Sequence, residues 1–182
     1  MKQSDTETTT SAGNMVTGLF NDRASAERAY QSVTNRGYEA DDVNLVMSDD
    51  TRNKYFSNSS GTETELGTKA AEGAGVGGAI GGTIGAIAAA IAAVGTSIAI
   101  PGLGIVIAGP IAAALAGAGA GGATGTLVGA LVGSGIPEER VKNYQAGIKS
   151  GGILMGVKPR SEADAAHFEK TWKDSQGEHV YR

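Results

Sequence analysis

The sequence contains no cysteine, and only 5% of its residues are aromatic. Without cysteine the chain has no disulfide, no thiol nucleophile and no thiolate ligand for a metal. So few aromatic rings form a poor base-stacking surface, and a formal net charge of −4 gives no general affinity for nucleic acid. Histidine is also scarce, with His167 and His179 as the whole supply. We therefore expect neither thiol chemistry nor nucleic acid as a partner.

Charge is missing from one long stretch, because no Asp, Glu, Lys or Arg occurs between Gly73 and Pro137. The stretch also holds most of the 29 glycines of the chain. It is too long for one core helix, and a bilayer-spanning helix needs about 20 apolar residues. Pro101 and Gly102 form a natural break near its middle. The stretch therefore predicts two membrane-depth helices joined by a turn.

The polar flanks on both sides predict a small α/β domain that the uncharged stretch divides. Four parts are expected: a disordered tail at 1–14, the first half of the domain at 15–64, a helical hairpin at 65–135 and the second half at 136–182. The expected elements are strands at 15–20, 43–47, 153–157 and 177–182, and helices at 23–36, 51–56 and 136–149. A last helix is expected to begin at the cap Ser161 and to carry Ala165, Phe168 and Trp172 on one side. The nearly continuous apolar run at 153–157 favours a central strand that is buried on both faces. This order favours an α+β fold: a ferredoxin-like two-layer sandwich interrupted by the hairpin.

The uncharged stretch has two distinct helical faces. Bulky residues recur at alternating steps of four and three and form one stripe, expected to face lipid or a partner: Ile80, Ile84, Ile87, Ile91, Val94 and Ile98. Glycines at every fourth position form the helix-packing faces: Gly77, Gly81 and Gly85 in the first half, then Gly117, Gly121, Gly125, Gly129 and Gly133 in the second. Small residues at this spacing let helix backbones approach closely in lipid. We expect a tight antiparallel glycine-zipper hairpin with its turn near residues 101–104.

This hairpin predicts a location and leaves alternatives open. Lys69, Arg140, Lys142 and Lys149 flank the stretch, so the positive-inside rule places both termini on the cytoplasmic side of the membrane. The second half has little bulk between Leu115 and Leu127, so we expect it to insert only as a pair or with other copies. Burial in a soluble cytoplasmic oligomer and stacking as a β-rich segment are the alternatives.

Several motifs suggest chemistry, but structural roles explain them better. Residues 73–78 match G-x-G-x-x-G, yet no strand precedes them and no acidic residue follows at the required distance. The carboxylates of Asp41, Asp42, Asp49 and Asp50 are typical of helix caps rather than of a metal site. The two adjacent acids at 138–139 fit the first turn of a helix, and the two histidines have no evident catalytic partners. We predict no catalytic residue, no metal, no cofactor and no small-molecule substrate.

The flanking segments resemble a known family. The segment VTGLFNDRASAERAYQSVTNRGYEADDVNLVMS is similar to the start of the bacterial general stress protein 17M-like (YflT-like) domain, with a strand ending in Phe20, the pair Gly37-Tyr38 and the pair Asp41-Asp42. The segment IPEERVKNYQAGIKSGGILMGVKPRSEADAAHFE and the uncharged middle resemble stress-associated proteins that combine this domain with a glycine-zipper hairpin. The resemblance implies a stress-response role and no catalytic residues.

The expected function follows from these patterns. We expect a non-enzymatic bacterial stress-response protein that is anchored or embedded in the membrane by the hairpin and assembles with other copies of itself. A soluble homo-oligomeric scaffold, in which the hairpins bury one another, is the alternative. A small-ligand sensor that uses the ferredoxin-like domain is a third hypothesis.

Overall fold

The computed structural model describes residues 15–56, 87, 91, 97–100, 104–117, 127–133 and 135–182. The elements before the uncharged stretch are β1 (Val16–Phe20), α1 (Arg23–Thr34), a short 3₁₀ helix (Ala40–Asp42), β2 (Val43–Ser48) and α2 (Asp49–Phe56). Those within it are β3 (Ser97–Ile100), β4 (Ile105–Ala108), α5 (Pro110–Gly117) and α6 (Leu127–Gly133). The chain continues with α7 (Glu138–Lys149), β5 (Ile153–Val157), α8 (Glu162–Asp174) and β6 (Glu178–Tyr181).

Six strands of the described residues form one sheet, in the order β3-β4-β2-β5-β1-β6. Every neighbouring pair is antiparallel. β5 lies between β2 and β1, and each of its residues is buried. The prediction that residues 153–157 form a central strand, buried on both faces, is therefore confirmed.

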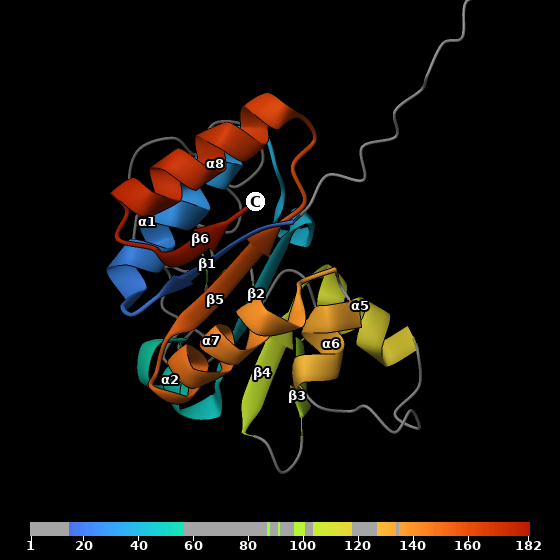
Figure 1. Ribbon diagram of the computed structural model, residues 1–182. Helices are drawn as coiled ribbons and strands as arrows, with labels where there is room; N and C mark the ends of the chain where they lie inside the picture. The colour runs from blue at the N-terminus through green and yellow to red at the C-terminus, as the bar shows by residue number, and fades with distance from the viewer. Residues whose placement is uncertain are drawn as a thin grey trace, which may run out of the picture.

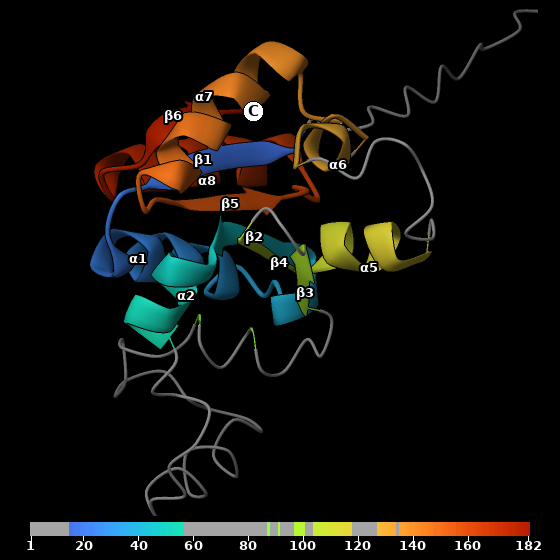
Figure 2. The ribbon, with the colours of Figure 1, turned by 90° about the horizontal axis from the view of Figure 1, so that it is seen from below.

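Helices cover both faces of this sheet, and Figure 2 shows α1 and α7 on opposite sides of it. Successive residues of a strand point to opposite faces, and this alternation separates two hydrophobic clusters. Cluster 1 contains Val16, Phe20, Leu45, Met47, Ile153 and Met155 from the strands, packed with α1 and α8. Cluster 2 contains Leu19, Val46 and Leu154, packed with α5, α6 and α7. The prediction of a two-layer sandwich is wrong, because α7 fills a third layer on the second face.

Helix caps and apolar helix faces that are evident in the sequence are present in the structure. The Asp22 carboxylate accepts a hydrogen bond from the Ser25 backbone N–H at 2.9 Å and caps α1. Ser161 caps α8 in the same way, by accepting from the Asp164 N–H at 3.1 Å. The apolar face of α8 buries Trp172 completely, and its ring meets Phe20 edge-on at 5.8 Å between centroids. The mixed α/β fold with an antiparallel sheet follows directly from these caps and apolar faces.

The middle of the uncharged stretch is a β-hairpin, not the turn of a helical hairpin. β3 and β4 pair from Ser97↔Ala108 to Ile100↔Ile105, and β4 also pairs with β2 from Leu45↔Ala108 to Ser48↔Ile105. Figure 1 shows these two strands continuing the sheet beyond β2. The prediction that Ile98 extends a helical stripe is wrong, because β-branched residues crowd residues 97–108 and favour a strand.

Other predicted positions lie outside the described residues. They are the tail at 1–14, the end of the first half of the domain at 57–64, and Gly77, Gly81, Gly85, Gly121, Gly125, Ile80, Ile84 and Val94. Within the part of the chain that the structure describes, every helix is too short or too polar to cross a bilayer.

Candidate functional site

The uncharged stretch contacts the strands of the α/β domain where β4 ends and α5 begins. Asn44 is a buried polar residue among the apolar residues of β2, and its Oδ1 accepts a hydrogen bond from the Ile111 backbone N–H at 2.8 Å. Its Nδ2 donates to the Gly156 carbonyl oxygen of β5 at 3.4 Å. One side chain thus satisfies a donor in the first turn of α5 and connects α5 to two strands of the sheet.

Gly109 makes this junction possible. Its φ is +99°, which favours glycine, and a Cβ at this position would lie 2.3 Å from the carbonyl oxygen of Val43. The chain therefore turns from β4 into α5 in direct contact with the backbone of β2. A residue with a side chain would push these two segments apart.

A second junction holds the first half of the uncharged stretch to α1. The Glu27 side chain is buried on α1, and its Oε2 accepts a hydrogen bond from the Ile87 backbone N–H at 3.2 Å. Glu27 Oε1 also lies 3.5 Å from Arg23 Nε. The guanidinium of Arg23 donates to the Tyr55 carbonyl oxygen at 2.6 Å and lies 5.2 Å from the centre of the Phe56 ring.

Described residues from the two halves of the uncharged stretch contact opposite faces of the sheet. Ile87 is completely buried in cluster 1, and Ile91 packs against the same cluster. Leu131 of α6 is completely buried in cluster 2, where Val128 also packs. The sequence pattern predicts that Ile87 and Ile91 face lipid or another copy. In the structure both residues pack against the chain's own core. At these described positions the halves do not form the expected antiparallel pair, because the sheet lies between them.

The packing glycines that the structure describes differ in what surrounds them. Gly117 ends α5 and Gly129 lies half-buried in α6. Gly133 ends α6, is exposed, and would place an added Cβ in open space. Its neighbour Val132 is the exposed large hydrophobic residue of the described chain, at 41% exposure. The end of α6 therefore presents a small residue and an apolar side chain to the surroundings.

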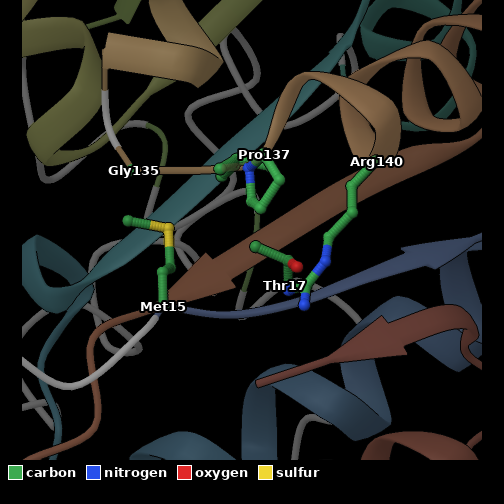
Figure 3. A pocket seen from close by; sticks show the side chains of 6 residues that line it. Met15, Thr17, Gly135, Pro137 and Arg140 are labelled. Carbon is green, nitrogen blue, oxygen red and sulfur yellow. The ribbon is translucent and has the colours of Figure 1, made fainter.

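A small pocket lies beside α7. It has a volume of about 40 Å³ and is lined by Met15, Thr17, Gly135, Ile136, Pro137 and Arg140. Figure 3 shows the labelled side chains arranged around it, with Arg140 reaching from α7 toward Thr17 on β1. A water molecule needs roughly 10–15 Å³ of such space, so the pocket has room for a few waters but not for a metabolite.

The polar groups behind this pocket form a structural network. The Thr17 and Tyr144 hydroxyl oxygens lie 2.7 Å apart, and Tyr144 donates to the His179 carbonyl oxygen at 2.8 Å. Burial raises the pKa of Tyr144 to about 12. The phenol therefore stays protonated near neutral pH and serves as a hydrogen-bond donor rather than as a base. Arg140 stacks over Tyr181 with its guanidinium carbon 4.5 Å from the ring centre, which fixes it to β6.

The carboxylates and histidines considered as ligands are separated. Asp41 and Asp42 precede β2, whereas Asp49 and Asp50 follow it, so the strand length keeps the pairs apart. Asp42 bonds Arg160 at 2.7 Å. His167 lies on α8 beside the Phe168 ring, and His179 belongs to β6. Among the described residues, no three Asp, Glu or His side chains converge in a way that suits a metal ion. Residues 73–78, the G-x-G-x-x-G match, lie outside them.

Sequence reasoning missed Asn44, Glu27 and Gly109. Asn44 and Glu27 do carry a signal, since each is a polar residue on an apolar strand or helix face and such a residue needs a partner when buried. The partners are backbone N–H groups at distant positions, which residue types do not indicate.

Comparisons with known proteins give no relative: no family model, no curated protein and no solved structure matches the chain.

Proposed function

We propose that this chain is a non-enzymatic assembly protein of a bacterial stress response, which associates with other copies of itself through the glycine-bearing faces of its uncharged stretch. The observation that carries the proposal is the end of α6. Gly133 leaves open space where a Cβ would lie, and Val132 beside it is 41% exposed. A small residue next to an exposed apolar one is the surface against which another helix packs closely.

The separation of the two halves supports association between molecules. Ile87 lies in cluster 1 and Leu131 in cluster 2, on opposite faces of the sheet. Two faces held apart in this way cannot pack against each other at these positions within one molecule. The exposed end of α6, at Val132 and Gly133, is left for contact with a second copy, and a homo-oligomer is the arrangement we propose.

For the α/β part we propose a ferredoxin-like unit made of β1-α1-β2 and β5-α8-β6. The strand order β2-β5-β1-β6 with antiparallel neighbours supports this assignment, because the β-α-β-β-α-β motif repeats one unit twice. In this assignment α7 and the uncharged stretch are additions between the two units. Their role is to cover the second face and to hold the packing segment in place.

The polar residues of the cores support a non-enzymatic role. Thr17, Tyr144 and Asn44 are buried and bond to backbone or to one another. A catalytic group instead needs to reach a substrate-sized space. The pocket of about 40 Å³ beside Thr17 is too small for this purpose.

Membrane attachment is the second candidate, and the charge-free composition favours it. Residues 73–96 carry no charge and are long enough for a span of about 20 residues. In this case the protein resides at the bacterial inner membrane, and the α/β domain lies on the cytoplasmic side. Carbonate washing of bacterial membranes tests it: attachment predicts that the full chain stays in the pellet, and complete release into the wash rejects membrane insertion.

Replacement of Gly133 by leucine tests self-association. An added Cβ meets no described atom within 4 Å, so we expect an unchanged fold and a weaker or smaller oligomer, as measured by light scattering coupled to size exclusion without detergent. Ala146→Leu is the matched control, because Ala146 is an exposed residue of α7 outside the uncharged stretch. If Gly133→Leu leaves the oligomer mass and its dissociation on dilution unchanged, the proposed packing face is wrong.

A further inference from the structure

The described methionines differ in their access to solvent. The chain contains four methionines, and three of them lie among the described residues. Met47 and Met155 are buried in cluster 1 at 1% and 0% exposure, whereas Met15 is half-buried and packs against cluster 2. A thioether must meet an oxidant to react with it, so its accessibility decides how fast it is oxidised. Met15 is thus the described methionine most open to oxidation.

The Met15 side chain fills a gap over the sheet. Met15 directly precedes β1, and Gly156 of β5, which pairs with Thr17 of β1, has no side chain of its own. A Cβ at Gly156 would lie 2.8 Å from Met15 Sδ. The thioether therefore occupies the space of the missing side chain and belongs to the packing of cluster 2.

Met15 also lines two cavities. One is the pocket of about 40 Å³ beside α7, and Figure 3 shows Met15 and Arg140 on opposite sides of it. Hydrogen peroxide is only slightly larger than water, so a pocket with room for a few waters admits it to the sulfur. The other is a cavity of about 10 Å³ in cluster 2, which is lined by Met15, Thr17, Asn44, Val46, Ile111, Leu131, Ile136, Leu154 and Gly156. Met15 therefore borders both a polar pocket and a mostly apolar cavity.

We propose that Met15 is a peroxide-sensitive site, at which oxidation to the sulfoxide moves the side chain from the gap over Gly156 into the pocket beside Arg140. In the reaction the sulfur lone pair attacks one oxygen of hydrogen peroxide, and the S–O bond forms as the O–O bond breaks. That oxygen stays on the sulfur, and the other leaves with both hydrogens as water. The sulfur is oxidised by two electrons and the peroxide is reduced. This inference does not depend on the proposed self-association.

The polarity of the sulfoxide sets the direction of the movement. Oxidation turns an apolar side chain into a polar one, and burying a polar oxygen without a hydrogen bond is unfavourable. In the cavity the polar side chains are those of Thr17 and Asn44, which are already engaged in hydrogen bonds. In the pocket the Arg140 guanidinium supplies N–H donors that suit a sulfoxide oxygen. The oxygen therefore favours the pocket, and the gap over Gly156 is left unfilled.

Peptide mapping of the full chain after graded treatment with hydrogen peroxide tests the site. Trypsin separates the three methionines, because Met15, Met47 and Met155 fall in the fragments 3–23, 37–52 and 150–160. We expect Met15 to be oxidised at least about tenfold faster than the two buried methionines, which react only when the core opens. Equal rates at the three positions would overturn the proposal.

Amide exchange between α6 and α7 tests the movement. Ile136 lines both cavities, and its backbone N–H donates to the Leu131 carbonyl oxygen at 3.1 Å. Once the thioether leaves cluster 2, we expect the Ile136 amide to exchange about three- to tenfold faster. The melting temperature should fall by about 2 to 4 °C, because packing around the gap is lost.

Met15→Leu is the matched variant, since leucine has a similar volume and does not form a sulfoxide. Peroxide should leave its exchange and melting temperature unchanged, whereas Met155→Leu should respond like the wild type. Repair of the oxidised wild type by methionine sulfoxide reductases should restore both measurements, and this experiment needs no substitution. Oxidation at Met15 without a change in exchange or melting temperature overturns the movement, and so does an equal response in Met15→Leu.

Discussion

Replacing Gly109 with alanine should be among the most disruptive single changes of the uncharged stretch. The φ of +99° at this residue costs a non-glycine residue about 1 to 3 kcal/mol. The added Cβ would also lie 2.3 Å from the Val43 carbonyl oxygen and 3.0 Å from the Asn44 Cα. These are backbone atoms of a strand that pairs with β5, so they cannot rotate away, and such overpacking costs about 1 to 3 kcal/mol more.

We therefore expect a loss of about 2 to 6 kcal/mol, a large part of the roughly 5 to 15 kcal/mol that stabilises an ordinary domain. For a chain of this size each kcal/mol lowers the melting temperature by about 2 to 4 °C. Urea unfolding followed by far-UV circular dichroism measures the loss, and hydrogen exchange at Val106, Ile107 and Ala108 should show that β4 opens first.

Gly133→Ala is the matched control for this experiment. It makes the same chemical change in the same uncharged stretch, but its Cβ meets open space and its backbone does not require a positive φ. We expect its unfolding midpoint to equal or slightly exceed that of the wild type, since alanine is the better helix former. If Gly109→Ala unfolds at the same urea concentration as Gly133→Ala, the close contact between β2 and the start of α5 does not exist as described.

Two further predictions concern the cluster 2 face. In Gly147→Ala the new Cβ lies 2.1 Å from a terminal methyl group of Leu19. We therefore expect a net loss of up to about 2 kcal/mol of stability in urea unfolding, although alanine is the better helix former. A gain in stability would contradict this packing of α7. Burial raises the pKa of Tyr144 to about 12, whereas an unfolded tyrosine titrates near 10. The unfolded chain therefore loses its proton first, and the stability that the neutral phenol contributes is complete below about pH 10 and is lost toward pH 12, by about 3 kcal/mol. Tyr144→Phe should flatten this decline between about pH 10 and about pH 12 in urea titrations, and an unchanged slope would contradict the assignment to Tyr144.

The α/β elements were predictable because their signals are local. Asp22 and Ser161 cap helices whose apolar residues recur at helical spacing, and the apolar run at 153–157 marks a strand buried on both faces. Each of these features depends on a few consecutive residues. The sequence pattern therefore identifies the element without knowledge of its neighbours.

The uncharged stretch was harder to interpret, since short apolar runs fit a strand or a helix equally well. Residues 105–108 became a strand because β2 offered an unpaired edge, which is a tertiary influence. The third layer was missed for a related reason, because α7 has an ordinary amphipathic pattern and the sequence does not state which face of the sheet it covers. Asn44 bonds a backbone N–H that is 67 positions away, and no pattern of residue types indicates such a partner.

The position of β4 beside β2 has a consequence for the protein while it is being made. A ribosome produces β2 early and β5 much later, with β4 between them, and domains begin to fold as the chain emerges. During that interval β2 would be an apolar strand with no partner from the α/β domain, which is the kind of edge that promotes aggregation. β4 reaches it first and pairs along Leu45 to Ser48. Because β4 precedes β5 along the chain, β4 can cover one edge of β2 in the nascent protein. β4 stays paired with β2 after β5 has paired with the other edge.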